Sequence, residues 1–349
     1  MKNTLFSINR MRSSLGRNLL IVIIILFMLL VWLFPTNPVT VDAIDEVPTS
    51  EVVLDGPVFP ETTPQPEVDS DPPLYDVPLA LAPHDHFYFT RPIAMDSNNA
   101  LLPDFRYGYY YQDQDAVHTG VDIPSPLHKP VLAAGDGVVV FAGYGLLTGK
   151  SDPNDPYGLA VMIRHDYSYD GKTIYTVYAH LDRVDVEKDD LVKSGDPVGI
   201  IGMTGNTTGP HLHFEVRVDD SNGNRVQNPE LWMAPPIGSG VLACQIKNSY
   251  GYLIAAQKVW LKSLDSQKVY EVLTYADTKH VYSDDYFKEN LVIGDIPAGQ
   301  YEISMIYKGK WYRAEVTIAP GTVNFVYFAG KDGFSQERPS APDPEEFLH

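Results

Sequence analysis

Cysteine is almost absent from this chain of 349 residues: Cys244 is the only one, so no intrachain disulfide can form. Asp and Glu do not occur before Asp42, and Lys and Arg do not occur from Pro35 to Thr90. A sustained helical period of apolar residues is also missing from about residue 86 to 235, which argues against a helix-rich core there. The folded part of the chain must therefore be stabilised by packed β-structure, without disulfide cross-links.

Positive charge is scarce over most of the chain, whose formal net charge is -19. A nucleic-acid partner would require a basic surface, so we expect no nucleic-acid binding. The same acidity argues against simple electrostatic adhesion to an anionic cell surface.

The N-terminus combines basic residues with a long apolar run from Leu19 to Phe34. The basic residues that precede this run are Lys2, Arg10, Arg12 and Arg17. The pattern predicts a cytoplasmic N-terminus at 1–17 and a transmembrane signal anchor at 18–35, with the remaining chain outside the cell membrane. A cleaved signal peptide, ending near Val41-Asp-Ala43 and giving a secreted protein, is the alternative.

Two segments have the composition of disordered chain. Residues 36–82 are acidic and rich in proline, and residues 331–349 are polar and also contain proline. Such segments bury too little apolar surface to offset the entropy of ordering, and acidic self-repulsion keeps them extended. We therefore expect a spacer at 36–82 and a disordered tail at 331–349.

The two remaining segments, 83–236 and 237–330, are expected to be all-β. In the first, Leu212-His-Phe-Glu-Val-Arg-Val218 alternates as a half-buried strand does. In the second, short β-prone runs recur between turn residues, which is typical of a β-sandwich. The sequence thus predicts an antiparallel-sheet domain with a groove, then a small β-sandwich, after an N-terminal transmembrane helix.

Histidines carry the chemistry of the first domain. On a strand, His211 and His213 face the same side, so one imidazole can bind a metal while the other stays free for proton transfer. His118 and Asp122 add an imidazole and a carboxylate, both accepted by zinc, and His180 lies between the two motifs in the sequence. A zinc site with one open position and histidines beside it is a hydrolase pattern.

Four ordered sequence blocks resemble the M23 family of zinc metallopeptidases, the lysostaphin and LytM type of peptidoglycan endopeptidase. They are His118-Thr-Gly-Val-Asp122, Pro130-Val-Leu-Ala-Ala-Gly-Asp-Gly-Val138, Tyr178-Ala-His180-Leu181 and Thr204-Gly-Asn-Thr-Thr-Gly-Pro-His-Leu-His-Phe-Glu215. Position by position, the resemblance implies that His118, Asp122 and His213 bind Zn²⁺. It implies that His180 and His211 are catalytic but unligated, and that the substrate is a peptide of peptidoglycan.

The catalytic histidines are assigned separate roles. We expect His211 to act as the general base and His180 to stabilise the tetrahedral intermediate. Glu215 follows His213 by two residues and is expected to orient it, while Tyr111 is a further candidate for contact with the oxyanion.

Other polar residues are expected to play structural parts. His165 is predicted to lie in the core or behind the metal ligands. His84 and His86 are predicted to be solvated, and Cys244 to be a small buried apolar residue. The polar segment from Lys150 to Pro156 is expected to form one wall of the groove.

The second domain resembles the carboxypeptidase regulatory-like, transthyretin-like β-sandwiches. The resemblance depends on Asp295-Ile-Pro-Ala-Gly-Gln-Tyr301 and Val241-Leu-Ala-Cys-Gln-Ile246 and transfers no catalytic residue.

Two alternatives to a peptidoglycan endopeptidase remain open. One is a catalytically idle cell-wall-binding or hydrolase-activating module, and the other is a zinc peptidase acting on exported proteins. The sequence does not identify a protein partner.

Overall fold

The computed structural model describes residues 74–82, 84–94, 101, 103–112, 115–218, 225–276 and 281–336. The chain divides into two compact units, Met1–Gln65 and Pro66–His349, and every described residue belongs to the second. The anchor predicted at 18–35 lies outside the described residues, so it stays a prediction. Within the described part of the chain, no helix is long and apolar enough to span a membrane.

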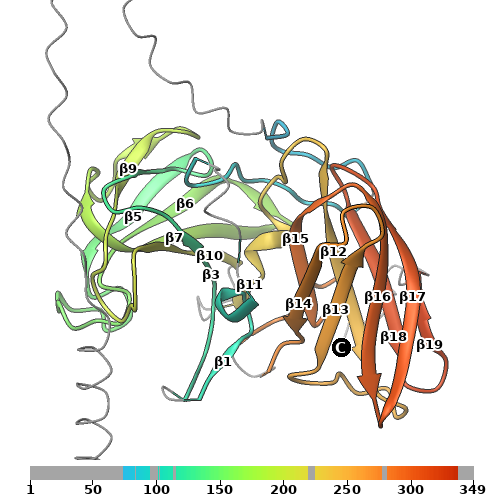
Figure 1. The fold of residues 1–349 in the computed structure, drawn as a ribbon. Coiled ribbons are helices and arrows are strands. Elements are labelled where there is room, and N and C mark those ends of the chain that lie inside the picture. Colours follow the sequence, from blue (N-terminus) through green and yellow to red (C-terminus); the bar gives the residue numbers. More distant parts are fainter. Residues whose placement is uncertain are drawn as a thin grey trace, which may run out of the picture. The chain divides into compact units, whose positions relative to one another are not determined.

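A nine-stranded sheet forms the first part of this unit (Figure 1). Its main path runs β11-β10-β7-β6-β5-β8, with β3 paired to β10 and with β9 paired to β4 and β7, and all of these pairs are antiparallel. Its strands are β3 (Val121–Pro124), β4 (Pro130–Leu132), β5 (Gly137–Tyr144), β6 (Leu159–Tyr169), β7 (Lys172–Val184), β8 (Leu191–Val192), β9 (Pro197–Ile201), β10 (His211–Val218) and β11 (Arg225–Gln227). The antiparallel sheet that the alternating sequence predicted is confirmed.

Short elements precede and follow this sheet. The hairpin β1 (Tyr110–Tyr111) and β2 (Ala116–Val117) forms a separate two-stranded sheet. The 3-10 turns η1 (Pro103–Phe105) and η2 (Pro229–Leu231) are the helical elements of the described residues. The near absence of helix agrees with an all-β fold.

Two four-stranded sheets make up the rest of the unit, in the orders β15-β12-β18-β19 and β14-β13-β16-β17. Their strands are β12 (Ser239–Lys247), β13 (Lys258–Ser263), β14 (Val269–Leu273), β15 (Leu291–Pro297), β16 (Gly299–Tyr307), β17 (Lys310–Ile318), β18 (Val323–Ala329) and β19 (Gly333–Ser335). Their facing side chains share one apolar core, so they form a β-sandwich. β12 and β18 pair in parallel, whereas the other pairs are antiparallel. The family resemblance of this sandwich stays a prediction.

The boundaries of the predicted spacer and tail differ from the structure at their inner ends. Leu74 pairs with Pro236 and Leu79 with Phe87, so the chain is ordered before residue 83. At the other end, β19 pairs with β18 inside the segment predicted to be a tail. Backbone pairing with distant parts of the chain orders both of these stretches, and composition alone does not reveal it.

Strand β12 is buried on both of its faces. Val241 and Ala243 belong to the apolar core that includes the nine-stranded sheet, whereas Leu242 and Cys244 belong to the core of the sandwich. Because alternate residues of a strand point to opposite faces, the first sheet of the sandwich is covered on both sides. The sandwich and the nine-stranded sheet therefore share a continuous apolar contact. Cys244 is a free, buried thiol, as predicted.

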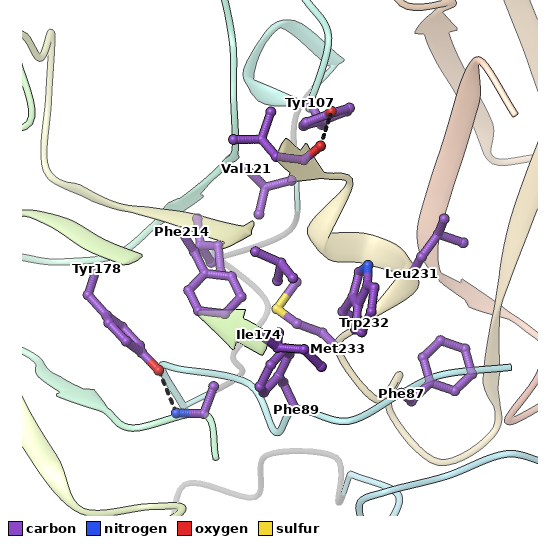
Figure 2. Close-up of a cluster of buried hydrophobic side chains, with 14 of the residues drawn as sticks. Phe87, Phe89, Tyr107, Val121, Ile174, Tyr178, Phe214, Leu231, Trp232 and Met233 are labelled. Atoms are coloured by element: carbon purple, nitrogen blue, oxygen red, sulfur yellow. Dashed lines mark hydrogen bonds between the residues drawn. The ribbon is translucent and has the colours of Figure 1, made fainter. Parts of the chain in front are cut away.

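Trp232 is the largest side chain fully buried in the core that includes the nine-stranded sheet. Figure 2 shows it among Phe87, Phe89 and Met233. In the same cluster the hydroxyl oxygen of Tyr178 accepts the backbone N–H of Ala134 at 2.8 Å. The core thus combines aromatic packing with a satisfied buried hydroxyl.

We expect Trp232→Ala to destabilise the protein by about 3–5 kcal/mol, because it removes a fully buried aromatic side chain and leaves a cavity. The matched control is Trp311→Ala, since Trp311 is 48% exposed, and its cost should be within about 1 kcal/mol. Denaturant unfolding of both variants measures the difference. Equal costs would show that Trp232 is not a central part of the core.

The prediction that His86 is solvated is wrong. The side chain is buried, its ring centroid lies 4.4 Å from that of Trp232, and its Nδ1 lies 2.7 Å from the carbonyl oxygen of His84. His84 itself is exposed and stacks on Tyr286. The aromatic contacts that bury His86 come from residues distant in the sequence, so the local polar context misled the prediction.

His165 lies in the core, as predicted. Its Nδ1 is 3.0 Å from the carbonyl oxygen of Asp136 and its Nε2 is 2.8 Å from the hydroxyl of Thr176. Burial lowers the pKa of His165 to about 4. It is therefore a neutral, hydrogen-bonded core residue.

Candidate metal centre

The register of three strands brings the predicted metal ligands together. Asp122 on β3 lies directly opposite His213 on β10, and His213 also pairs with Ala179 on β7. Opposite residues of an antiparallel pair have Cβ atoms about 5 Å apart, so their side chains meet on the same face. His118 precedes β3, and its imidazole joins Asp122 and His213 in a buried cluster.

Three atoms of this cluster converge on one point. Nε2 of His118 lies 3.0 Å from Oδ1 of Asp122 and 3.0 Å from Nδ1 of His213. Nδ1 of His213 lies 2.9 Å from the same Oδ1. The three atoms form a nearly equilateral triangle.

The hydrogen positions make all three converging atoms acceptors. Nδ1 of His118 lies 3.0 Å from the carbonyl oxygen of Arg106, and Nε2 of His213 lies 3.0 Å from a carboxylate oxygen of Glu215. Both partners can only accept, so these outer nitrogens carry the hydrogens and the inner nitrogens of the neutral rings present lone pairs. Three acceptors at such distances require a proton or a cation between them.

Zinc fits this donor set. Its bonds to imidazole nitrogen and carboxylate oxygen are about 2.0–2.2 Å long, and three donor atoms that lie about 3 Å from one another could all bind one such ion. Two imidazoles and one carboxylate leave the fourth tetrahedral position free, as in catalytic zinc sites. The donor chemistry is therefore that of a catalytic metal centre.

The electrostatics of the cluster favour a positive charge. Burial opposes ionisation of Asp122, but His118 and His213 hold the pKa of its carboxyl well below the usual range. Burial likewise disfavours the charged form of His213, but hydrogen bonds to Asp122 and Glu215 raise its pKa to about 9. A proton and a metal ion would thus compete for the same place.

Glu215 orients His213 from behind, as predicted. Besides His213, its Oε1 accepts the hydroxyls of Thr119 and Tyr157, and its Oε2 accepts Nε–H of Arg217 at 2.7 Å. Glu215 is fully buried, and although burial opposes it, Arg217 and His213 hold the pKa of the carboxyl well below the usual range. An ionised carboxylate on the outer nitrogen fixes the tautomer of His213 and increases the basicity of its inner nitrogen.

His211 and His180 lie beside the cluster without joining it. Their ring centroids are 4.8 Å apart, and that of His180 is 5.6 Å from that of His213. Nδ1 of His211 lies 2.8 Å from the carbonyl oxygen of Gly209, and Nδ1 of His180 lies 2.8 Å from that of Thr204. These carbonyls hold the hydrogens on Nδ1, so each Nε2 presents a lone pair.

Burial keeps both of these rings neutral. It lowers the pKa of His180 to about 3, with a further contribution from the neighbouring His213 and His211. It also lowers the pKa of His211, although Asp122 opposes the shift. Nε2 of His211 is buried, makes no hydrogen bond to the described residues and lies 3.5 Å from Oδ2 of Asp122.

The backbone of His180 is strained. Its φ of 63° lies in the left-handed region, which costs a non-glycine residue roughly 1 kcal/mol or more. Its N–H bonds to the carbonyl of Tyr157 at 3.0 Å, and its ring bonds to Thr204, so contacts on two sides hold this conformation. With this backbone conformation, the residue lines the same cavity as the predicted metal ligands.

The ligands and both free histidines line one cavity of about 610 Å³. Leu147, Pro156 and Tyr157 contribute to its wall, so the segment from Lys150 to Pro156, predicted to form a wall, contributes only its last residue. Tyr111 also lines it, and its hydroxyl donates to the carbonyl of Asp104 at 2.9 Å. The predicted metal ligands and the two unligated histidines therefore share one cavity.

Gly120 has a steric rather than a conformational role. A Cβ at this position would lie 2.4 Å from the carbonyl oxygen of Phe214 and 3.0 Å from Cε1 of His213. The backbone between His118 and Asp122 therefore passes against β10 so closely that only glycine fits.

Sequence reasoning missed three contributors to the site. The carbonyl of Arg106 holds His118, and the hydroxyls of Thr119 and Tyr157 hold Glu215. Thr119 lies inside the His118-Thr-Gly-Val-Asp122 motif, so its position in the sequence could have indicated that it belongs to the site. Arg106 acts through its backbone, which no residue-type pattern reveals.

Comparison with known proteins agrees with this geometry. Residues 116–228 match the model of Peptidase family M23. The DD-carboxypeptidase/endopeptidase Mpg of Neisseria meningitidis is 38% identical over 122 residues, which are 34% of this chain and 25% of that protein. Peptidoglycan DD-endopeptidase ShyA of Vibrio cholerae is 40% identical over 104 residues, which are 30% of this chain and 21% of that protein. The match thus spans about a quarter of the length of these relatives.

Among solved structures, the catalytic domain of lysostaphin from Staphylococcus simulans is 31% identical, with a TM-score of 0.31 over 36% of this chain and 86% of that one. The family match covers β2 to β11 and contains every residue of the metal cluster and both free histidines. The chain therefore contains a peptidase domain of family M23.

Proposed function

We propose that the protein is a zinc-dependent endopeptidase that hydrolyses peptide bonds in the cross-links or stem peptides of peptidoglycan. The observation that carries the proposal is the convergence of three acceptor atoms beside two unligated imidazoles in one open cavity. The first set is suited to hold Zn²⁺ and the second to move protons. A bound zinc ion would lower the pKa of a coordinated water and polarise the scissile carbonyl.

His211 is the proposed general base. Its Nε2 is buried without a hydrogen bond to the described residues, and its Nδ1–H is fixed on the carbonyl of Gly209. It can therefore accept the proton of the attacking water and later donate it to the leaving amine. The carboxylate of Asp122, 3.5 Å away, favours the imidazolium formed between these steps.

His180 is the proposed stabiliser of the tetrahedral intermediate. Because its Nδ1 hydrogen is used on Thr204, its Nε2 can donate only after gaining a second proton, which burial opposes. The proposed proton transfer is therefore centred on His211, which takes the first proton of the attacking water. His180 can donate to the intermediate only after its Nε2 has accepted the second proton of that water.

The substrate class is inferred from the relatives, several of which are named peptidoglycan DD-endopeptidases. Two alternatives make different predictions. An idle wall-binding or hydrolase-activating module would not release fragments, and a peptidase of exported proteins would cleave denatured protein in preference to cell wall.

Chelation provides the test. We expect purified peptidoglycan incubated with the protein to release soluble muropeptides carrying new free amines, detected by mass spectrometry. A chelator should abolish the release and added zinc should restore it, because the three ligands hold the ion that activates water. Denatured protein serves as the competing substrate. Persistence of hydrolysis without metal, or absence of release despite bound zinc, would contradict the proposal.

We also propose that the protein is anchored in the cell membrane by residues 18–35, with its catalytic domain on the extracytoplasmic side. The basic N-terminus followed by an apolar run supports this orientation. External protease added to intact spheroplasts should digest the catalytic domain. Protection of that domain, or its recovery in the medium with a new N-terminus, would contradict the anchored form.

A further inference from the structure

Besides its contacts with Asp122 and His213, His118 is held by backbone groups of one short segment of the chain. Its Nδ1–H bonds to the carbonyl of Arg106, its backbone N–H bonds to the carbonyl of Tyr109 at 2.8 Å, and its backbone carbonyl accepts N–H of Gly108 at 2.9 Å. Three hydrogen bonds thus tie one metal ligand to residues 106–109, which we call the ligand-holding segment. The position of His118 depends on where this segment lies.

The β-sandwich holds the ligand-holding segment at Gly108. N–H of Ala276 bonds to the carbonyl of Gly108 at 2.9 Å. Gly108 has a φ of 80°, and a Cβ there would lie 2.5 Å from the ring of Tyr275, so the tyrosine packs directly on the glycine backbone. This contact leaves no room for the segment to shift towards the sandwich.

Tyr107 provides a second attachment. Its side chain is buried, and its hydroxyl accepts N–H of Tyr282 at 2.7 Å. The same hydroxyl lies 3.0 Å from the carbonyl oxygen of Val226, to which it donates. The tyrosine therefore joins the end of the peptidase sheet to the chain that precedes β15.

Arg106 provides the third attachment, through a buried ion pair. Its guanidinium contacts Oε2 of Glu230, and the same oxygen accepts the backbone N–H of Gly294 on β15 of the sandwich. Both side chains of the pair are at most 7% exposed. A continuous path of hydrogen bonds thus runs from His118 through Arg106 and Glu230 to the sandwich.

The ion pair is poorly suited to a purely stabilising role. Nε of Arg106 and Oε1 of Glu230 are buried without a hydrogen-bond partner among the described residues. A buried pair that leaves polar atoms unsatisfied gains little net stability after the cost of desolvation. The pair has a larger effect on geometry than on stability, because it fixes Arg106, whose backbone carbonyl orients His118.

We infer that the C-terminal β-sandwich is a positioning element of the metal centre, acting through Arg106, Glu230 and Gly294 on His118. The inference depends on the metal site of the proposed function. It assigns to the sandwich a role in holding zinc, in contrast to a spacer or an independent binding module. Outer partners of metal ligands typically contribute a factor of about 10–100 to metal affinity.

Gly294→Ala in the full-length protein is the most selective test. A Cβ at this position would lie 2.9 Å from Oε2 of Glu230 and 3.2 Å from its Cβ, so the substitution displaces Glu230 without changing any charge. We expect zinc affinity, measured by competition with a chromophoric chelator, to fall about tenfold. Arg106→Met, which keeps the backbone carbonyl but removes the guanidinium, should lower it by about 10–100-fold, with partial rescue in Arg106→Lys.

Arg91→Met is the matched control. Arg91 is buried and pairs with Asp295, the residue next to Gly294, but the described contacts do not connect it to a metal ligand. Its loss should also lower the free energy of unfolding, though by less than Arg106→Met because Asp295 is 21% exposed, yet leave zinc affinity within about twofold of the parent. Denaturant unfolding of the metal-free proteins provides the stability comparison.

The outcomes separate this inference from the proposed activity. Zinc affinity that is equal in Gly294→Ala, Arg106→Met and Arg91→Met would overturn the positioning role while leaving the endopeptidase proposal intact. Zinc binding that is weaker in Gly294→Ala and Arg106→Met but not in Arg91→Met would support the positioning role. If the parent then hydrolysed no peptidoglycan, the proposed activity would be refuted. A parent that binds no zinc would overturn both.

Discussion

His213→Ala is expected to deprive the protein of its metal and of its activity. The imidazole supplies one of three converging ligand atoms, so zinc affinity should fall by more than about 100-fold, beyond the loss that outer partners cause. The fold should persist, because Glu215 keeps its hydrogen bonds to Thr119, Tyr157 and Arg217. Zinc content after dialysis and muropeptide release measure the two effects.

The control for this substitution is His128→Asn. The imidazole of His128 is 65% exposed, and asparagine tolerates the positive φ of this position. Both zinc content and activity should equal those of the parent. Stoichiometric zinc in His213→Ala would show that His213 is not a ligand and that the cluster was misassigned.

His211→Ala is expected to keep the metal and lose turnover. Its Nε2 does not belong to the ligand triangle, so zinc content should be unchanged. Removal of the proposed general base should lower kcat by about 10²–10⁴-fold. Zinc analysis and steady-state hydrolysis of a peptidoglycan cross-link peptide measure the two quantities.

His180→Asn extends this comparison, since asparagine tolerates the left-handed backbone of position 180. It should also keep zinc, with a decrease in kcat no larger than that of His211→Ala, because the proposed proton transfer is centred on His211. Equal loss of metal in His211→Ala and His213→Ala would mean that the roles of the two histidines were assigned wrongly.

Much of the candidate site was predictable because its residues lie in short motifs. A strand places His211 and His213 on the same face, and the structure shows both in one cavity. The relation of Glu215 to His213 follows from the same period of two and is confirmed by their hydrogen bond. The all-β, antiparallel character of the first domain was equally evident from the alternation of apolar residues.

Other features were not predictable from residue types. His86 was expected to be solvated, but aromatic residues from distant segments bury it. The paired strand β19 lies where composition indicated a tail, because a partner strand is present there. In both cases a contact between distant parts of the chain outweighed the local sequence.

The sequence, through the resemblance of its motifs to family M23, predicted the donor set of His118, Asp122 and His213, which are residue types that zinc accepts. It also indicated two further histidines and the β-rich character of both domains. Only the tertiary structure decided what holds the ligands in place: the carbonyl of Arg106, its buried pair with Glu230, and the backbone of Gly294. A carbonyl or an N–H is present in nearly every residue, so its role depends on which segments the fold brings together.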